Sequence, residues 1–291
     1  MKAAMIGLGA MGAHMAVNLD RAGLLAAVWN RSRDKAAQLP VGDTVLRAGS
    51  PAAAAATAEV IITCVSRDAD VMSVVEAMLP GLKAGAVVCD TSTVSAATAR
   101  ALADMLAPHG VAFLDCPVSG GVEGARKATL AMMVGGGADA LSRAKPVLEK
   151  IAANIVHMGP TGSGQATKAV NQIMAAGINQ AVTQALAFGA AMGLDMDKVI
   201  DVVGSGAAAN WFLSHRGKTM VGGRYAPGFK VALHHKDLAI AREMAAARGA
   251  QPLSVVEETL RDYASLMESG HGEEDISALY RLKSAGFRSG T

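Results

Sequence analysis

Hydrophobic residues in the first 160 positions gather in short runs, each followed by a turn-forming residue and then by an alanine- and leucine-rich stretch. The runs are Ala3–Ile6, Ala26–Trp29, Val60–Val65, Ala86–Asp90, Ala112–Asp115 and Ala131–Val134. Consecutive apolar positions are typical of strands that are buried on both faces of a parallel sheet. Because such runs alternate with helical stretches, the pattern predicts an α/β domain over residues 1–161.

The pattern changes after Thr161-Gly162-Ser163-Gly164. From Gln165 to about Met192 the chain is one alanine-rich stretch almost without turn signals, which predicts a single long helix. Strand-like alternation is nearly absent beyond it. Shorter helices are expected near Met196–Val203, Lys236–Arg248 and Leu253–Glu268. We therefore predict an all-α domain over residues 162–291, joined to the first domain by the long helix.

The composition excludes several classes of protein. The chain has 291 residues, of which 51% are hydrophobic and 18% charged, so it can bury a large core. Its net charge is only +2 and its aromatic content 3%. Nucleic-acid binding usually requires a strongly basic domain or a platform of aromatic residues. No nucleic-acid partner is expected.

One segment, Met174–Leu194, is long enough to cross a bilayer. Four polar side chains interrupt it: Asn179, Gln180, Thr183 and Gln184. A membrane span prefers about 20 nearly uninterrupted apolar residues, so a buried helix fits this segment better. The N-terminus shows no cleavable signal pattern. We expect a cytoplasmic protein that does not enter a membrane.

No metal site is expected. The three cysteines, Cys64, Cys89 and Cys116, lie far apart in apolar runs without metal-ligand spacing, which indicates buried, reduced thiols. The pair His234-His235 has only Asp237 nearby as a further ligand, so it is better interpreted as a pair at the entry of a helix.

The first apolar run leads into Gly7-Leu8-Gly9-Ala10-Met11-Gly12, a G-x-G-x-x-G turn before a helix over Ala13–Ala22. In such a turn the first glycine permits a tight bend, the second lets the backbone approach a pyrophosphate, and the third lets the helix pack closely on the strand. The free N–H groups of the helix N-terminus attract the phosphates. We predict a doubly wound, Rossmann-type sheet that binds a dinucleotide with Gly7, Leu8, Gly9, Met11 and Gly12.

The end of the second run determines the choice of dinucleotide. NAD enzymes usually place a carboxylate there for the ribose hydroxyls, but this chain has Asn30-Arg31-Ser32-Arg33. Two guanidinium groups and a hydroxyl can hold a 2′-phosphate, so NADP(H) is favoured, with NAD(H) as the alternative. The simpler interpretation is that Arg31 and Arg33 are solvated loop charges.

Polar residues also follow two further runs. Val65 ends the run that begins at Val60, and Ser66 follows it. Thr93 lies just after the run that ends at Asp90. Loops at the carboxyl ends of parallel strands line the ligand crevice, so we expect these three residues to contact the cofactor. For the two hydroxyls the alternative is a role as helix N-caps.

Two segments are candidates for the chemistry. Ser119, Gly120 and Gly121 follow the run that ends at Asp115, and adjacent glycines with a hydroxyl can direct backbone N–H groups at a carboxylate. Lys168 opens the long helix. Asn171 and Gln172, three and four positions later, share its face.

These segments together resemble the β-hydroxyacid dehydrogenase family, which includes 3-hydroxyisobutyrate dehydrogenases, tartronate semialdehyde reductases and glyoxylate or succinic semialdehyde reductases. The resemblance covers nearly the whole chain. It is carried by the glycine turn, by Pro117-Val118-Ser119-Gly120-Gly121, by the helix with Lys168, and by Lys236-Asp237-Leu238. It implies that Lys168 is catalytic, that Ser119–Gly121 hold the substrate carboxylate, and that Lys236 reaches the cofactor and substrate.

The chain departs from the family at one position. The amide that assists the lysine is usually an asparagine four residues on, where this chain has Gln172 after Asn171. We favour Asn171 for that role over Gln172. The residue chemistry agrees with the resemblance, because an ammonium group can supply both charge and a proton to a developing alkoxide.

Other functions are weighed against this one. An imine reductase is similar in fold but generally carries another residue in place of Lys168. A non-catalytic NADP-binding module is expected to lack that lysine and to carry an extra domain. A 6-phosphogluconate dehydrogenase needs a longer second domain. The sequence thus predicts a reductase of small carboxylate-bearing aldehydes or oxo acids, assembled as a homodimer or homotetramer through apolar helices.

Overall fold

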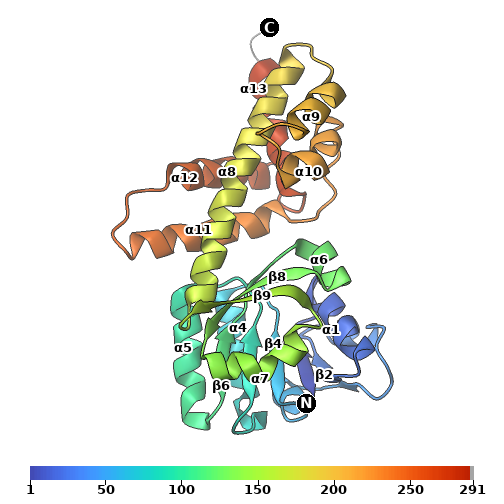
Figure 1. Cartoon of the computed structure of the whole chain (residues 1–291), viewed down its shortest axis with the longest axis vertical. Helices are drawn as coiled ribbons and strands as arrows, with labels where there is room; N and C mark the ends of the chain where they lie inside the picture. The colour runs from blue at the N-terminus through green and yellow to red at the C-terminus, as the bar shows by residue number, and fades with distance from the viewer. Residues whose placement is uncertain (289–291) are drawn as a thin grey trace. The chain divides into compact units, whose positions relative to one another are not determined.

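The computed structural model describes residues 1–288 and divides into two compact units, Met1–Lys168 and Ala169–Thr291 (Figure 1). The division lies inside the long helix. The segment 162–168, which the sequence pattern places in the second domain, therefore belongs to the first unit.

A nine-stranded sheet forms the centre of the first unit, in the order β3-β2-β1-β4-β5-β6-β8-β7, with β9 paired to β8. Its strands are β1 (Ala3–Ile6), β2 (Leu25–Trp29), β3 (Leu46–Arg47), β4 (Val60–Thr63), β5 (Val87–Asp90), β6 (Ala112–Asp115), β7 (Val118–Ser119), β8 (Leu130–Gly136) and β9 (Ala152–Gly159). In the order of the sheet, the first six strands, β3-β2-β1-β4-β5-β6, are parallel to one another. The predicted α/β class is confirmed.

Two hydrophobic cores lie on opposite faces of this sheet. Ala3 and Met5 of β1 pack in one core and Ala4 and Ile6 in the other, because successive side chains of a strand point to opposite faces. Helices cover both cores: α1 (Gly12–Arg21), α2 (Arg33–Ala37), α3 (Pro51–Ala55), α4 (Asp68–Met78), α5 (Ala96–Leu106), α6 (Gly121–Lys127) and α7 (Ala138–Leu148). Burial on both sides explains the uninterrupted apolar runs.

The sheet differs from the prediction at its far end. The run Ala131–Val134 is part of β8, which is antiparallel to β6 and β7 rather than parallel. The strands β3, β7 and β9 are not predicted by the hydrophobic pattern, because β3 and β7 have two residues each and most side chains of β9 are exposed.

The described part of the second unit contains helices and one isolated bridge, between Lys230 and Asp275. Helix α8 (Ser163–Ala191) confirms the long helix. The others are α9 (Met196–Gly204), α10 (Trp211–Val221), α11 (Val231–Ala246), α12 (Ser254–Glu268) and α13 (Leu279–Arg288). The all-α prediction holds, but α11 begins five residues before the expected Lys236, and α10 and α13 are not expected from the sequence.

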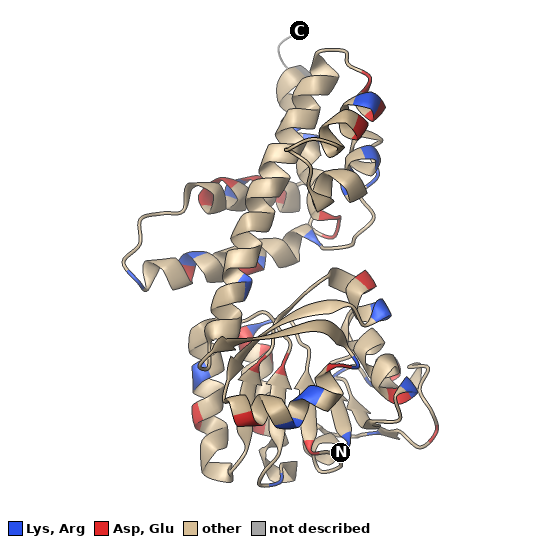
Figure 2. Cartoon of the chain, in the orientation of Figure 1, with Lys and Arg blue, Asp and Glu red and all other residues tan. Residues whose placement is uncertain are grey.

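Charged residues of both signs are distributed over both units (Figure 2). Helix α8 is the exception, since Lys168 is the only charged residue between Ser163 and Ala191. None of the described helices combines the length and the apolar character that a membrane span needs.

Candidate active site

The glycine turn has the geometry that its motif predicts. Gly7 has a φ of +96°, and a Cβ atom there would overlap the carbonyl oxygen of Cys64. A Cβ atom on Gly12 would overlap the carbonyl oxygen of Gly7, so α1 can pack this closely only with glycine. Around Gly9 the space is open. The turn therefore leaves room for a pyrophosphate above Gly9 and beside the N-terminus of α1.

A hollow of about 250 Å³ adjoins this turn. It is lined by Gly7, Gly9, Trp29, Asn30, Arg31, Ser32, Lys35, Cys64, Val65, Ser66, Asp70, Ser73 and Val74. The glycine turn and the carboxyl ends of β2 and β4 thus meet at one place. Seven of the residues predicted to bind the cofactor line it: Gly7, Gly9, Asn30, Arg31, Ser32, Val65 and Ser66.

The other predicted cofactor residues are not among those that line the hollow. The side chain of Leu8 is buried in the core, and its N–H donates to Asn30 Oδ1 at 2.8 Å. Met11 precedes α1 and packs against the same core. Thr93 lies after β5, and Lys236 belongs to the second unit. The N-cap positions of α4 and α5 are Arg67 and Ser95, so Ser66 and Thr93 lie before them in the chain.

The charged residues of the hollow differ from the predicted pair of arginines. Lys35 lines the hollow instead of Arg33. Asp70, in the first turn of α4, also lines it, and its Oδ1 lies 3.4 Å from the Arg31 guanidinium. Asp70 was not predicted from the sequence, because a carboxylate that selects the cofactor is expected at the end of β2. The position of Asp70 just after the β4 run is the signal that could have identified it.

Asp115 and Gln165 fix the start of α8. The two carboxylate oxygens of Asp115 accept the N–H groups of Gly162 at 2.8 Å and Gln165 at 2.9 Å. The Gln165 side chain donates to the Ser92 carbonyl at 2.8 Å and accepts the Val94 N–H at 3.2 Å. The helix is thereby attached to the carboxyl ends of β5 and β6. Neither residue was a sequence-based candidate, because both roles depend on contacts between distant segments.

Lys168 lies in the second turn of this anchored helix and is buried, with 7% of its surface exposed. Its ammonium group donates to the Val118 carbonyl at 2.9 Å. The next three residues are the predicted carboxylate-binding group, Ser119, Gly120 and Gly121. Gly120 and Gly121 have φ values of +126° and +60°, a conformation that favours glycine. The structure thus brings the predicted lysine and the predicted anion-binding loop together.

Asp115 has a second buried carboxyl group beside it, that of Asp90. Asp90 and Asp115 are register neighbours in β5 and β6. Asp90 Oδ1 accepts from the Thr63 hydroxyl at 2.7 Å, while Oδ2 has no hydrogen-bond partner among the described residues. Burial raises the pKa of Asp90 to about 6, and it also raises the pKa of Asp115 despite the N–H groups that face it.

In the second unit, the two amides after Lys168 form a chain of contacts. Asn171 Nδ2 donates to Gln172 Oε1 at 2.7 Å, and Gln172 Nε2 donates to Asp237 Oδ2 at 2.6 Å. The other oxygen of Asp237 lies 3.0 Å from the Lys236 ammonium. Gln172 is buried, whereas Asn171 is half-buried. Gln172 therefore joins α8 to α11 through its amide nitrogen, while its amide oxygen holds Asn171.

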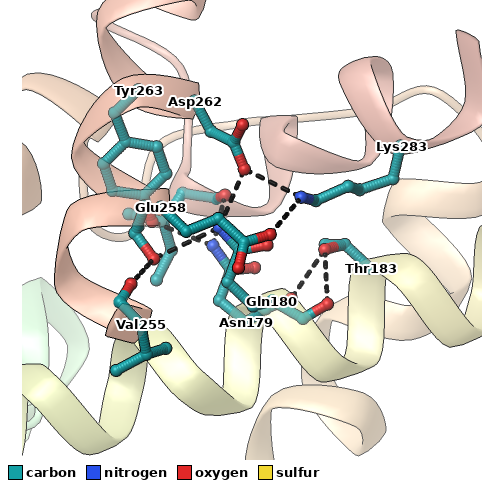
Figure 3. Close-up of polar contacts among 10 residues, drawn as sticks. Asn179, Gln180, Thr183, Val255, Glu258, Asp262, Tyr263 and Lys283 are labelled. Atoms are coloured by element: carbon teal, nitrogen blue, oxygen red, sulfur yellow. Dashed lines mark hydrogen bonds and ion pairs between the residues drawn. The ribbon is translucent and has the colours of Figure 1, made fainter. Parts of the chain in front are cut away.

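Further polar contacts hold α8 against the other helices of this unit (Figure 3). Asn179 donates to the Tyr263 hydroxyl at 2.9 Å, and Gln180 donates to Asp262 at 2.8 Å. Lys283 of α13 binds the same carboxylate at 2.8 Å. Two of the four polar residues that interrupt the segment 174–194, Asn179 and Gln180, thus serve helix packing, whereas Gln184 is exposed. His234 is buried within hydrogen-bonding distance of the Tyr263 hydroxyl and the Gln172 carbonyl.

Among the described residues, no group of three or more His, Cys, Asp or Glu side chains is arranged so that it could hold a metal ion.

Both units match models of known protein domains. Residues 2–159 match the model of the NAD-binding domain of 6-phosphogluconate dehydrogenase, and residues 162–283 match the model described as NAD-binding of NADP-dependent 3-hydroxyisobutyrate dehydrogenase. An uncharacterised oxidoreductase of Shewanella frigidimarina is 38% identical over 97% of this chain and 98% of its own length. An NAD-dependent L-serine dehydrogenase of Pseudomonas aeruginosa is 32% identical, covering 96% of each chain.

Among solved structures, the 3-hydroxyisobutyrate dehydrogenase of Mycobacterium tuberculosis with L-serine superposes with a TM-score of 0.85 and 33% identity, over 97% of this chain and 98% of the other.

Proposed function

From the premise that the chain belongs to the β-hydroxyacid dehydrogenase family of NAD(P)-dependent oxidoreductases, we propose that it transfers a hydride between NADP(H) and a small carboxylate-bearing substrate. The substrate is a β-hydroxy acid, its semialdehyde or a 2-oxo acid, of the 3-hydroxyisobutyrate, tartronate semialdehyde, glyoxylate or succinic semialdehyde type. The observation that carries the proposal is the buried ammonium group of Lys168 beside Ser119, Gly120 and Gly121.

The hollow beside the glycine turn fits a dinucleotide, since the space at Gly9 is open where a pyrophosphate would approach. Gly7, Gly9 and Gly12 would hold the pyrophosphate, with Val65, Ser66 and Thr93 as further contacts. Arg31, Ser32 and Lys35 favour a 2′-phosphate, so NADP(H) is preferred and NAD(H) is the alternative. When bound, the nicotinamide supplies or accepts the hydride.

Lys168 supplies the proton in the direction of reduction. Its ammonium group donates to the carbonyl oxygen of the substrate and stabilises the negative charge that develops there. In the direction of oxidation the neutral amine takes the proton of the hydroxyl. The Val118 carbonyl keeps the amine at the side of the loop Ser119–Gly121.

Asn171 is the amide that assists Lys168. Both lie on one face of α8, because they are three residues apart. The amide of Gln172 is occupied at both ends, by Asn171 and by Asp237. Gln172 is therefore a positioning residue, which orients Asn171 and links it to Asp237 and Lys236. We assign Lys236 to the binding of the cofactor and substrate, as in the family.

A comparison of acids with their esters tests the proposed function. With NADPH, the protein should reduce short semialdehydes and oxo acids that carry a free carboxylate, and should show at least about tenfold lower kcat/KM for their methyl esters, because a charge-assisted contact is worth roughly 1.5–3 kcal/mol. The same panel with NADH should give lower kcat/KM for every acid. Equal rates for acid and ester would refute the carboxylate anchor, and equal use of both cofactors would refute the preference for NADP(H).

The chain also carries a surface suited to a homo-oligomer. Met174, Ile178, Ala181, Ala185, Phe188 and Met192 are exposed along α8 and just after it, at spacings of four, three, four, three and four residues. This spacing keeps them on one stripe of the helix. A twofold antiparallel crossing with a second copy would pair Ala181 with Ala185 at the centre and the larger side chains towards the ends. Small residues at a crossing allow close approach, so we propose a homodimer through this stripe, alone or within a homotetramer.

Light scattering coupled to gel filtration tests the dimer. Ala181→Glu should convert the dimer to monomers at micromolar concentrations, because the two copies would bring buried like charges together. The matched control is Ala190→Glu, at another exposed alanine of α8 that lies off the stripe. If both variants keep the mass of the unmodified protein, the stripe is not the interface.

The protein is expected to act in the cytoplasm, where the three free thiols, Cys64, Cys89 and Cys116, would stay reduced.

A further inference from the structure

We infer that Asp70 determines how strongly the protein discriminates between NADP(H) and NAD(H), by competing with the 2′-phosphate for Arg31. The inference rests on the proposed function, because it concerns the same cofactor site.

The site contains both kinds of group that distinguish the two cofactors. Arg31 and Lys35 are the cations of the hollow and Asp70 is its carboxylate. Arg31 comes from the loop after β2, whereas Asp70 comes from the first turn of α4, after β4. A carboxylate accepts hydrogen bonds from the ribose hydroxyls of NAD, and a guanidinium group binds the 2′-phosphate of NADP. The carboxylate that is missing at the end of β2 is thus supplied by the helix that follows β4.

Asp70 is available for this role, while its neighbour Asp68 is not. Asp68 accepts the Ser95 N–H at 2.9 Å and the Thr98 hydroxyl at 2.6 Å, which fixes its carboxylate at the start of α5. Asp70 instead contacts Arg31, at 3.4 Å. The side chains of Arg31 and Asp70 are 87% and 32% exposed, and an exposed ion pair contributes little free energy. Arg31 can therefore exchange the carboxylate for a phosphate at low cost.

The consequence differs between the two cofactors. A 2′-phosphate carries more than one negative charge, so it attracts Arg31 and Lys35 but is repelled by Asp70. A 2′-hydroxyl is not repelled, and it gains an acceptor. Asp70 thereby weakens the binding of NADP(H), strengthens that of NAD(H), and limits the selectivity that the two cations would give alone.

Binding of NADPH and NADH, measured by fluorescence titration at low salt, tests the inference with Asp70→Asn. The matched control is Glu76→Gln, which removes the same charge from an exposed position of α4 outside the hollow. We expect Asp70→Asn to raise the ratio of the NADH Kd to the NADPH Kd by about tenfold, a change of 1.4 kcal/mol. Glu76→Gln should leave the ratio within about twofold. The change should shrink at high salt, because exposed charges are screened.

An unchanged ratio in Asp70→Asn, or an equal change in Glu76→Gln, would overturn the inference. If the unmodified protein prefers NADH and Asp70→Asn still shifts the ratio towards NADPH, the role of Asp70 stands and the proposed preference for NADP(H) is wrong. Adding Arg31→Ala to Asp70→Asn separates the two effects of the carboxylate. The shift towards NADPH should become smaller in that background, because Arg31 is then no longer released to the phosphate.

Discussion

Replacement of Lys168 by alanine should lower kcat by about 100- to 10,000-fold, the usual loss when a positioned general acid is removed. The change also removes a buried positive charge that stabilises the developing alkoxide. Binding of NADPH, followed by fluorescence titration, should be nearly unchanged, since Lys168 is not among the residues that line the hollow beside the glycine turn. Lys168→Arg should restore little activity, because a guanidinium group keeps its proton at neutral pH.

The exposed Lys145→Ala is the matched control and should retain full activity. If Lys168→Ala kept more than about a tenth of the activity, far above the range expected for a general acid, another group would have to donate the proton. Lys236 would then be the next residue to replace.

Replacement of Asp115 by alanine should both destabilise the protein and impair catalysis. The change leaves two N–H groups at the start of α8, those of Gly162 and Gln165, without their carboxylate. Loss of contacts to a buried charged group costs roughly 2–4 kcal/mol of unfolding free energy, which urea denaturation measures. Lys168 follows Gln165 by one helical turn, so kcat should fall at least about tenfold by loss of its orientation.

Asp275→Ala is the control that separates the orientation of Lys168 from the stability of the protein. Asp275 is also a buried carboxylate, and it accepts the N–H groups of Gly228 and Phe229, each at 3.0 Å. It has further partners in Ser277 and Arg216, so the change to alanine should cost at least as much unfolding free energy. At a temperature where both variants are fully folded, only Asp115→Ala should lower kcat with little change in the Kd for NADPH. Equal losses of kcat in the two variants would mean that Asp115 acts through stability alone.

The parts of the fold that the sequence predicts are those set by local pattern. Burial on both faces produced the continuous apolar runs of β1, β4 and β5, and the absence of turn residues marked α8. The short strands β3 and β7 carry too few residues for a pattern to be recognised. The direction of β8 could not be read from its residues, because apolar strands look alike in either direction.

The candidate site also contains residues that a local motif predicts and residues that only the folded chain reveals. The glycine turn and the lysine stand in recognisable motifs, so their positions could be predicted. Asp70, Asp115 and Gln165 act across 39 to 73 positions of sequence, and only the folded chain brings them to their partners. Lys35 lines the hollow in place of the expected Arg33. The reason is that α2 begins at Arg33, and the turn of this helix directs Lys35 towards the hollow.

The buried carboxyl groups at the ends of β5 and β6 couple folding to proton uptake. In the folded chain Asp90 has a pKa of about 6, compared with the ordinary value of 3.8. At a pH between these two values, Asp90 keeps a proton in the native state that it has released in the unfolded chain. Asp90 therefore favours folding most below about pH 4, and this contribution to stability is lost as the pH rises through 6. A shift of roughly two units corresponds to about 3 kcal/mol. The pKa of Asp115 is raised as well, so its contribution has the same sign. At neutral pH, therefore, the strand ends that hold the lysine-bearing helix carry unfavourable buried charge, and mild acid relieves it.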